Sequence, residues 1–314
     1  MNVLSLFDGM SCGQLALSRA GIQVDNYYSS EIDKYAISIA QKNYPSTIQL
    51  GDVCSLTSTP EPIDLLIGGS PCQGFSFAGK QLNFDDPRSA LFFEYVRILE
   101  ELKPRHFLLE NVRMKQEYQD IISDILKTKP VIINSALVSA QNRVRFYWTN
   151  IDFEVLEDRG IKLRDVVFND SCAIALSNVY GGFKESYPRI HTGKSPTIRT
   201  ASGGGHIPSL LLSENAIKYM DRNVKGGRNH WDFGHHSDIR NDKSSAVVAN
   251  FFKGVPYNVL KDNNCVRKFH PVECERLQTV PDNYTEGVSN SQRYKMLGNG
   301  WTVDVVAHIF KGMN

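Results

Sequence analysis

The chain has 314 residues, of which 41% are hydrophobic and 22% are charged. This composition is typical of a globular protein and excludes collagen-like, disordered and disulfide-scaffold chains. The sequence contains no run of about eighteen apolar residues and no signal-peptide pattern at its start, so we expect no membrane association. Six cysteines without a CxxC pair suit a reducing compartment, and we expect a cytoplasmic protein.

Charge is distributed unevenly along the chain. The net charge is only +1, yet the segment from Lys184 to Lys268 holds 14 Lys and Arg against 7 Asp and Glu. A basic, glycine-rich segment beside an acidic remainder is consistent with nucleic-acid binding. A solvated irregular insertion would give the same pattern, so charge alone leaves both interpretations open.

The first 150 residues alternate short apolar runs with stretches of helical periodicity. The apolar runs predict strands over residues 3–6, 24–30, 64–67, 106–109 and 144–148. The periodic stretches predict helices over residues 14–20, 34–43, 91–102 and 118–126. This alternation implies a parallel sheet with helices on both faces, in which ligands bind at the carboxyl ends of the strands.

The alternation stops near residue 170. Residues 170–265 are rich in Gly, Asn, Ser and His, and they predict a separate, irregular small domain. Residues 303–310 are apolar with helical spacing, and we expect them to form the helix that closes the chain.

Three features of the first half suggest an adenosine site. The turn over residues 7–13 carries glycines and opens the first predicted helix, so its backbone can approach a nucleotide-like ligand. Taken alone, it fits a tight turn without a ligand equally well. Glu31 follows the second strand, where an acid can bind two ribose hydroxyls. Asp52, in Gly51-Asp52-Val53, ends what would be a third strand ahead of the run at residues 64–67, and it could face an adenine amine.

A cysteine and an acid follow two further strands. Cys72 comes just after a strand end, where nearby helix N–H dipoles favour the thiolate; a buried inert cysteine would more often lie within an apolar run. Glu110 ends the apolar strand that begins at His106, and apolar surroundings favour the proton-donating form of a carboxyl group. Taken alone, Glu110 could equally be a surface acid at a strand end.

Two arginines lie at the start of the last predicted strand of the sheet. Arg143 and Arg145 are two residues apart, so in a strand they would lie on one face. There they could bind a carbonyl group and orient a carboxylate. A pair of charges on an edge strand is the alternative.

In this order, the motifs resemble those of the cytosine-5 DNA methyltransferases over the whole chain. The resemblance includes the turn after the first strand, the two acids, Pro71-Cys72-Gln73, Glu110-Asn111-Val112 and the strand from Gln141 to Arg145. Residues 267–284 and Gly298-Asn299 resemble the last two motifs of that family.

Some details are similar to the animal de novo DNA methyltransferases, namely Phe7-Asp8-Gly9 and Trp301. The chain is too short for the chromatin-reading domains of those enzymes, so we expect a stand-alone prokaryotic or phage type. Ser11 and Cys12 depart from the pattern, because many bacterial members carry glycines there.

The resemblance implies an α/β fold, with a Rossmann-like S-adenosylmethionine-dependent methyltransferase sheet and a smaller irregular target-recognition domain. It implies a catalytic and cofactor-binding domain over residues 1–170, completed by 285–314, and a target-recognition domain over 171–284. The cofactor would be S-adenosylmethionine. The residues implied to bind it are Phe7, Gly9, Met10, Glu31, Ile32, Asp52, Val53, Pro71, Leu91, Asn299 and Trp301.

The resemblance also implies the catalytic roles. Cys72 would add to cytosine C6 while Glu110 protonates N3, and Arg145 would bind O2 while Arg143 holds the loop and Glu110 in place. The cytosine would be flipped out of duplex DNA, with residues 74–89 closing over it. The residues implied to contact DNA are Gln73, Ser76, Lys80, Gln81, Arg199, Arg228 and Arg240.

The expected partners are double-stranded DNA and a cognate restriction endonuclease, and the expected oligomeric state is a monomer. We expect no metal, because no cysteine or acid completes a ligand set around His230, His235 and His236. One alternative is a tRNA cytosine-5 methyltransferase, although the Cys-Phe-Thr tripeptide of that branch is missing. Another is a catalytically silent relative that only binds DNA, although such relatives usually lose the nucleophile or the acid. A dinucleotide oxidoreductase would leave Pro71-Cys72-Gln73 unexplained.

Overall fold

The computed structural model of the protein describes residues 1–71, 87–162, 165–166, 168, 174–177, 189–197, 209–211, 266–268 and 270–313. The chain divides into two compact units. The first comprises Met1–Ser135, Val144–Glu157 and Gly300–Asn314, and the second comprises Ala136–Arg143 and Asp158–Asn299. These bounds differ from those of the two domains implied by the family resemblance, and that functional division stays a prediction.

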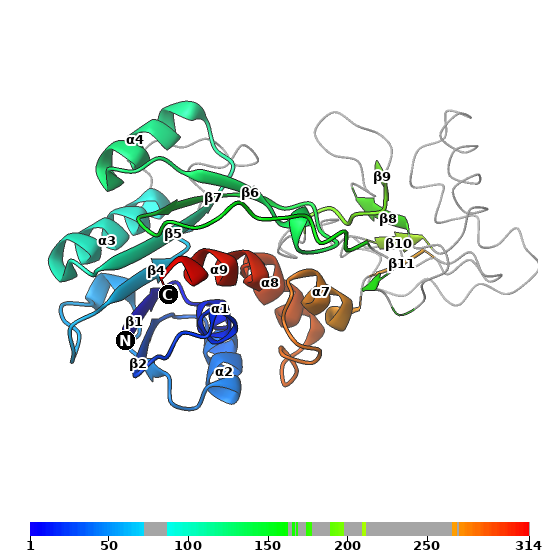
Figure 1. The fold of residues 1–314 in the computed structure, drawn as a ribbon. Coiled ribbons are helices and arrows are strands. Elements are labelled where there is room, and N and C mark those ends of the chain that lie inside the picture. Colours follow the sequence, from blue (N-terminus) through cyan, green and yellow to red (C-terminus); the bar gives the residue numbers. More distant parts are fainter. Residues whose placement is uncertain are drawn as a thin grey trace, which may run out of the picture. The chain divides into compact units, whose positions relative to one another are not determined.

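A seven-stranded sheet forms the centre of the first unit, with strand order β3-β2-β1-β4-β5-β7-β6 (Figure 1). The strands are β1 (Asn2–Leu6), β2 (Asn26–Ser30), β3 (Ile48–Gln49), β4 (Leu65–Gly68), β5 (His106–Val112), β6 (Val131–Asn134) and β7 (Val144–Thr149). Strands β1 to β5 pair in parallel, whereas β7 is antiparallel to both β5 and β6. This topology confirms the predicted Rossmann-like class.

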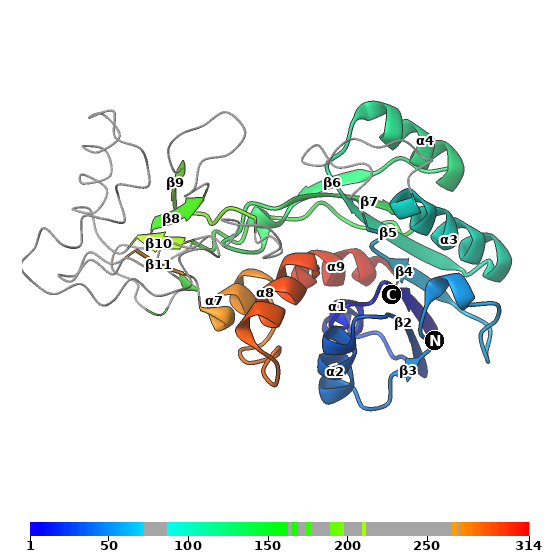
Figure 2. The ribbon, with the colours of Figure 1, turned by 180° about the vertical axis from the view of Figure 1, so that it is seen from behind.

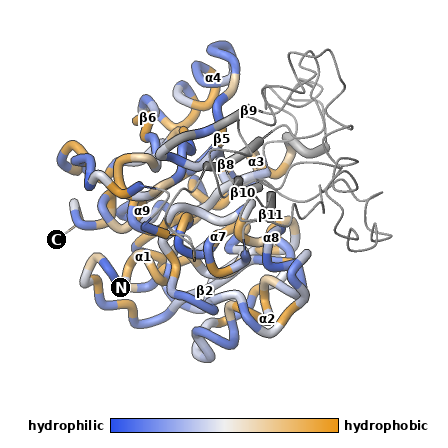
Figure 3. Tube along the Cα trace, turned by 90° about the vertical axis from the view of Figure 1, so that its right-hand side faces the viewer, coloured by the Kyte–Doolittle hydropathy of each residue, from blue (hydrophilic) through white to orange (hydrophobic). Residues whose placement is uncertain are grey.

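Helices cover both faces of this sheet. Figures 1 and 2 show α1 (Cys12–Ala20), α2 (Lys34–Asn43) and α9 (Val303–Phe310) on one face, and α3 (Pro87–Leu102) and α4 (Gln116–Leu126) on the other. Hydrophobic and hydrophilic residues alternate along α4 (Figure 3), which buries Tyr118, Ile122 and Leu126 at the four-residue spacing of an amphipathic helix. A short 3-10 helix, η1 (Val53–Ser55), follows β3.

The predicted parallel pairing is found for β1 to β5, whereas β7 runs antiparallel to its neighbours. A parallel neighbour needs a crossover connection, but the segment between β6 and β7 is short and contains only the 3-10 turn η2 (Ser135–Leu137). The chain therefore returns beside β6 in the opposite direction. Strand β6 is absent from the sequence prediction, although its residues Val131, Ile132 and Ile133 form a short apolar run.

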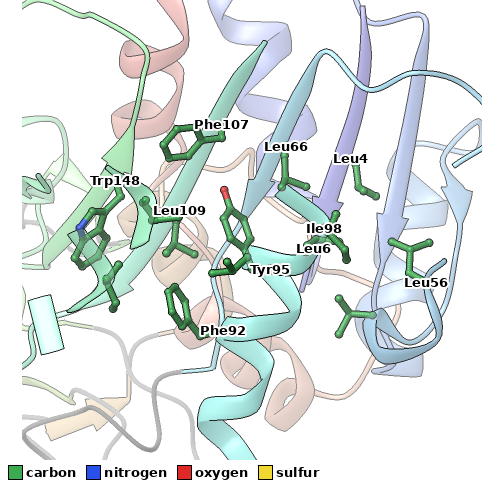
Figure 4. Packing of buried hydrophobic residues seen from close by; sticks show 14 of the residues in the cluster. Leu4, Leu6, Leu56, Leu66, Phe92, Tyr95, Ile98, Phe107, Leu109 and Trp148 are labelled. Atoms are coloured by element: carbon green, nitrogen blue, oxygen red, sulfur yellow. The ribbon is translucent and has the colours of Figure 1, made fainter. Parts of the chain in front are cut away.

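The core between the sheet and α3 positions the end of β4. Phe92, Tyr95 and Ile98 of α3 pack against Leu66 and Leu109 of the sheet (Figure 4). Gly68, the last residue of β4, allows this close packing, because a Cβ there would lie 3.0 Å from Tyr95 Cδ2. The strand end that leads to Pro71 is thus held firmly against a buried helix.

The second unit contains a four-stranded antiparallel sheet with strand order β11-β10-β8-β9. Its strands are β8 (Ile174–Ser177), β9 (Arg189–Thr192), β10 (Ser209–Leu211) and β11 (Val266–Lys268). Helices α7 (Pro271–Leu277) and α8 (Asn290–Asn299) belong to the same unit. The stretch predicted to be irregular therefore contains β8, β9 and β10, which are too short to show a period of two.

Candidate active site at the carboxyl ends of the strands

The carboxyl group of Glu110 in β5 and the guanidinium of Arg145 in β7 meet on one face of the central sheet. Glu110 is opposite Tyr147 in the antiparallel pairing, and Val112 is opposite Arg145, so Glu110 and Arg145 are diagonal neighbours. Arg145 Nε lies 2.9 Å from Glu110 Oε1, and the side chains are only 13% and 10% exposed. The pair thus places a carboxyl group beside a guanidinium at a nearly buried position.

Glu110 lies within its strand, whereas the sequence predicted it at the strand end. Strand β5 continues to Val112 because it pairs with β7 as far as Arg145. The additional neighbour, Arg145, is a charge that the apolar run before Glu110 could not reveal.

The backbone after β4 approaches this pair closely. A Cβ on Gly69 would lie 3.1 Å from Glu110 Oε2 and 3.0 Å from Trp301 Nε1. Glycine at this position therefore lets the chain pass beside both side chains. Two residues further, Pro71 ends the described segment, and the adjoining Cys72 lies outside the described residues.

A hydrogen bond holds the chain just before Pro71. Asn111 Nδ2 donates to Ser70 Oγ over 3.3 Å, and both side chains are buried. Asn111 follows Glu110 in β5, so the same strand carries the acid and fixes the backbone that leads to Cys72. Sequence reasoning assigned no role to Asn111, because an asparagine at a strand end gives no sign of its partner.

Residues 7–11, which we call the β1–α1 turn, connect β1 to α1 and have an unusual backbone. Phe7, Gly9 and Ser11 have φ values of 57°, 61° and 62°, all in the left-handed region. Glu31, directly after β2, accepts the Gly9 N–H at 2.8 Å with Oε2 and the N–H groups of Ile32 and Asp33 with Oε1. The carboxylate of Glu31 thus holds the turn at Gly9.

The surroundings of Gly9 fit a ligand with hydroxyl groups. Among the described residues other than Gly9 and its two chain neighbours, no atom lies within 4 Å of the position that a Cβ on Gly9 would occupy. There is thus open space at Gly9, whose N–H binds the Glu31 carboxylate. Asp52 lies at the start of η1, where Oδ1 accepts the N–H of Cys54 at 3.0 Å. Two carboxylates and an open glycine backbone at neighbouring strand ends are suitable for an adenosine group.

The residues implied to bind the cofactor lie in the first unit, apart from Asn299, which ends α8 in the second. Ile32 is 73% exposed, whereas Met10 and Val53 are buried and would contact a ligand through their backbone. Leu91 of α3 is partly buried against the core, and Trp301 precedes α9 with its indole nearly buried.

The two arginines do not share a strand face, so that prediction is wrong. Strand β7 begins at Val144, and Arg143 belongs to the second unit, where it is buried and its Nη2 donates to Gly298 O over 3.1 Å. Just before β7 the chain pairs with another segment instead: Gln141 forms an isolated bridge with Ser195, and the Asn142 N–H donates to Ser195 O.

Several predicted residues lie outside the described residues. These are the nucleophile Cys72, the implied DNA contacts Gln73, Ser76, Lys80, Gln81, Arg199, Arg228 and Arg240, and the three histidines 230, 235 and 236. Within the described part of the chain, no group of three or more His, Cys, Asp or Glu could hold a metal ion. No helix described here is both long and apolar enough to cross a membrane.

Known proteins similar to this chain include type II methyltransferases. The family model C-5 cytosine-specific DNA methylase matches residues 1–314. The type II methyltransferase M1.ScrFI of Lactococcus lactis subsp. cremoris is 30% identical, covering 99% of this chain and 77% of that protein. The type II methyltransferase M.NlaX of Neisseria lactamica is 29% identical, covering 99% and 95%.

A solved structure supports the same fold. A DNMT2 variant of Spodoptera frugiperda superposes with a TM-score of 0.66 at 20% identity, covering 99% of each chain. The family match over the full length, together with the strand order and the site at the strand ends, gives the assignment: the chain belongs to the C-5 cytosine-specific DNA methylase family.

Proposed function

We propose that the protein transfers a methyl group from S-adenosylmethionine to C5 of a cytosine in double-stranded DNA. The observation that carries this proposal is the convergence of Glu110, Arg145, Gly69 and Trp301 next to the segment that leads to Cys72. It brings an acid and a guanidinium to the strand edge from which the nucleophile extends.

Cytosine C6 is a weak electrophile, so the ring must be activated while it is attacked. The Cys72 thiolate forms a bond to C6, and the electron pair of the C5–C6 double bond becomes available at C5. Glu110 donates a proton to N3, which withdraws electron density from the ring and favours this addition. Arg145 binds O2 and keeps Glu110 aligned through their contact at 2.9 Å.

The remaining steps restore the ring. S-adenosylmethionine, when bound, supplies the electrophilic methyl group that C5 accepts. C5 then gives up its proton to water, the C5–C6 double bond forms again, and Cys72 leaves as a thiolate. Glu110 regains its proton from N3, so every protein group ends as it began.

The methyl donor would be held by the first unit. Glu31 would accept hydrogen bonds from the ribose hydroxyls, Asp52 would accept one from the adenine amine, and Trp301 would line the site. The open backbone at Gly9 supports this assignment, because an adenosine group can approach there without meeting a side chain.

The target base would be flipped out of the duplex at a cost of a few kcal/mol. Residues 74–89 would close over it, and residues 171–284 would select the sequence through base edges and phosphates. We further propose that the protein acts as a monomer and that its partner is a cognate restriction endonuclease, as the type II names of its relatives suggest.

Bisulfite sequencing tests the proposal. Mixed-sequence duplex DNA is incubated with the protein and S-adenosylmethionine, and we expect protected cytosines in one short sequence context. The matched control is Cys72→Ala, which should bind DNA and protect no cytosine; protection by that variant would contradict the role of Cys72. Protection of tRNA but not of DNA would support the tRNA alternative instead.

A further inference from the structure

An acid that no step above uses is buried beneath the β1–α1 turn. Asp8 accepts the Tyr27 hydroxyl at 2.7 Å with Oδ1, and the hydroxyls of Ser11 at 2.5 Å and Ser29 at 3.1 Å with Oδ2. Asp8 is buried, with 8% of its surface exposed. The carboxyl group thus joins two residues of β2 to the end of the turn.

Burial makes this acid costly to keep. Desolvation raises the pKa of Asp8, and the hydroxyl donors around it only partly offset that effect. An apolar side chain of similar size would avoid the cost of burying a carboxyl group. The acid is therefore better explained by the conformation it imposes than by a gain in stability.

The conformation in question is the left-handed one at Ser11. A residue with a Cβ rarely adopts φ near +60°, yet Ser11 has a φ of 62°. Ser11 is held there twice by Asp8, through its hydroxyl and through its N–H, which donates to Asp8 O over 3.2 Å. Consequently the Ser11 hydroxyl does not cap helix α1, whose N-cap position it occupies.

We propose that Asp8 is a positioning residue for the methyl donor, holding the β1–α1 turn in its binding conformation from inside the protein through Ser11 and Tyr27. This inference rests on the proposed function, since that function assigns the turn to S-adenosylmethionine. Glu31 fixes the outer side of the same turn at Gly9, and Asp8 fixes the inner side. The two acids together therefore bind the turn at both Gly9 and Ser11.

Two readouts test the proposal: calorimetric binding of S-adenosylhomocysteine, and amide hydrogen exchange at residues 7–11 without ligand. We expect Asp8→Ala to weaken binding about tenfold, as for a turn that is competent about one tenth of the time, and to speed exchange there. Asp8→Asn keeps an acceptor for Tyr27 and a donor for the serines, so it should bind within about threefold of wild type.

The control is Ile122→Ala, which removes a fully buried side chain of α4 on the other face of the sheet. It lowers stability in the same unit and should leave both readouts unchanged. The proposal is overturned if Asp8→Ala binds or exchanges like wild type, or if Ile122→Ala weakens binding equally. Should Asp8→Ala not fold, Tyr27→Phe replaces it, and wild-type values for both readouts in that variant would overturn the proposal.

The exchange readout separates this inference from the proposed function. If the wild-type protein does not bind S-adenosylhomocysteine, the assignment of the turn to the methyl donor fails. Faster exchange at residues 7–11 in Asp8→Ala would still support the hold of Asp8 on the turn, and equal exchange would refute it.

Discussion

Glu110 and Arg145 differ from an ordinary surface ion pair because both side chains are nearly buried. Burial reduces the screening of their interaction by water. Side chains that are 10% and 13% exposed lose much of the screening by water, so their mutual orientation is fixed more strongly than at the surface. Removing one partner leaves a nearly buried charge, whereas a neutral isostere keeps the shape. Glutamine at position 110 therefore tests proton donation with little change in packing.

We expect Glu110→Gln to slow methyl transfer by roughly 10²–10⁴-fold, the usual contribution of a general acid. The measurement is the single-turnover rate with labelled S-adenosylmethionine, which excludes product release. The control is Glu117→Gln, an exposed acid of α4, whose rate should equal that of wild type. A wild-type rate in Glu110→Gln would assign the proton donor to another group.

At the scale of elements, helix α3 carries a hydroxyl that its surroundings do not satisfy. Within the described residues, Tyr95 Oη is buried and has no hydrogen-bond partner, and desolvation raises the pKa of Tyr95 well above its ordinary value. The ring is still needed, because it packs against Gly68 at the end of β4. The hydroxyl therefore costs stability while the ring contributes to it.

We expect Tyr95→Phe to raise the free energy of unfolding by about 1–2 kcal/mol, since a buried group without a partner costs about 1–3 kcal/mol. Urea denaturation measures this change. Tyr27→Phe is the matched control and should lower the free energy of unfolding, because the Tyr27 hydroxyl donates to Asp8. Destabilisation by Tyr95→Phe would indicate that the hydroxyl has a partner.

Elements with a clear period could be predicted, and pairings between distant segments could not. The bounds of α2 and α9 agree with the sequence prediction, because each shows an apolar stripe over eight residues or more. The direction of β7 depends on the path of the connection before it, which its own residues do not encode. The contact between Glu110 and Arg145 and the burial of Asp8 depend on register, so the motifs indicated the site while its geometry required the fold.

At the scale of the whole molecule, the net charge of +1 is the sum of a basic segment and an acidic remainder. The segment from Lys184 to Lys268 is strongly basic, so the rest of the chain is acidic overall. A polyanion would therefore be attracted to one part of the chain only. Such an arrangement orients DNA before any base is read, and it makes binding depend on salt.

The salt dependence of DNA binding tests the arginines of this basic segment. In the inactive Cys72→Ala background, replacing Arg199, Arg228 and Arg240 by alanine should reduce the slope of log affinity against log salt by about 2 to 3. Each phosphate contact contributes about 0.9 to that slope. Fluorescence anisotropy with a labelled duplex between low and moderate salt gives the slope. Arg105→Ala, an exposed arginine in the segment between α3 and β5, is the control and should leave it unchanged. An unchanged slope in the triple variant would mean that these arginines do not contact phosphates, and the DNA-binding surface would then have to be sought elsewhere in the chain.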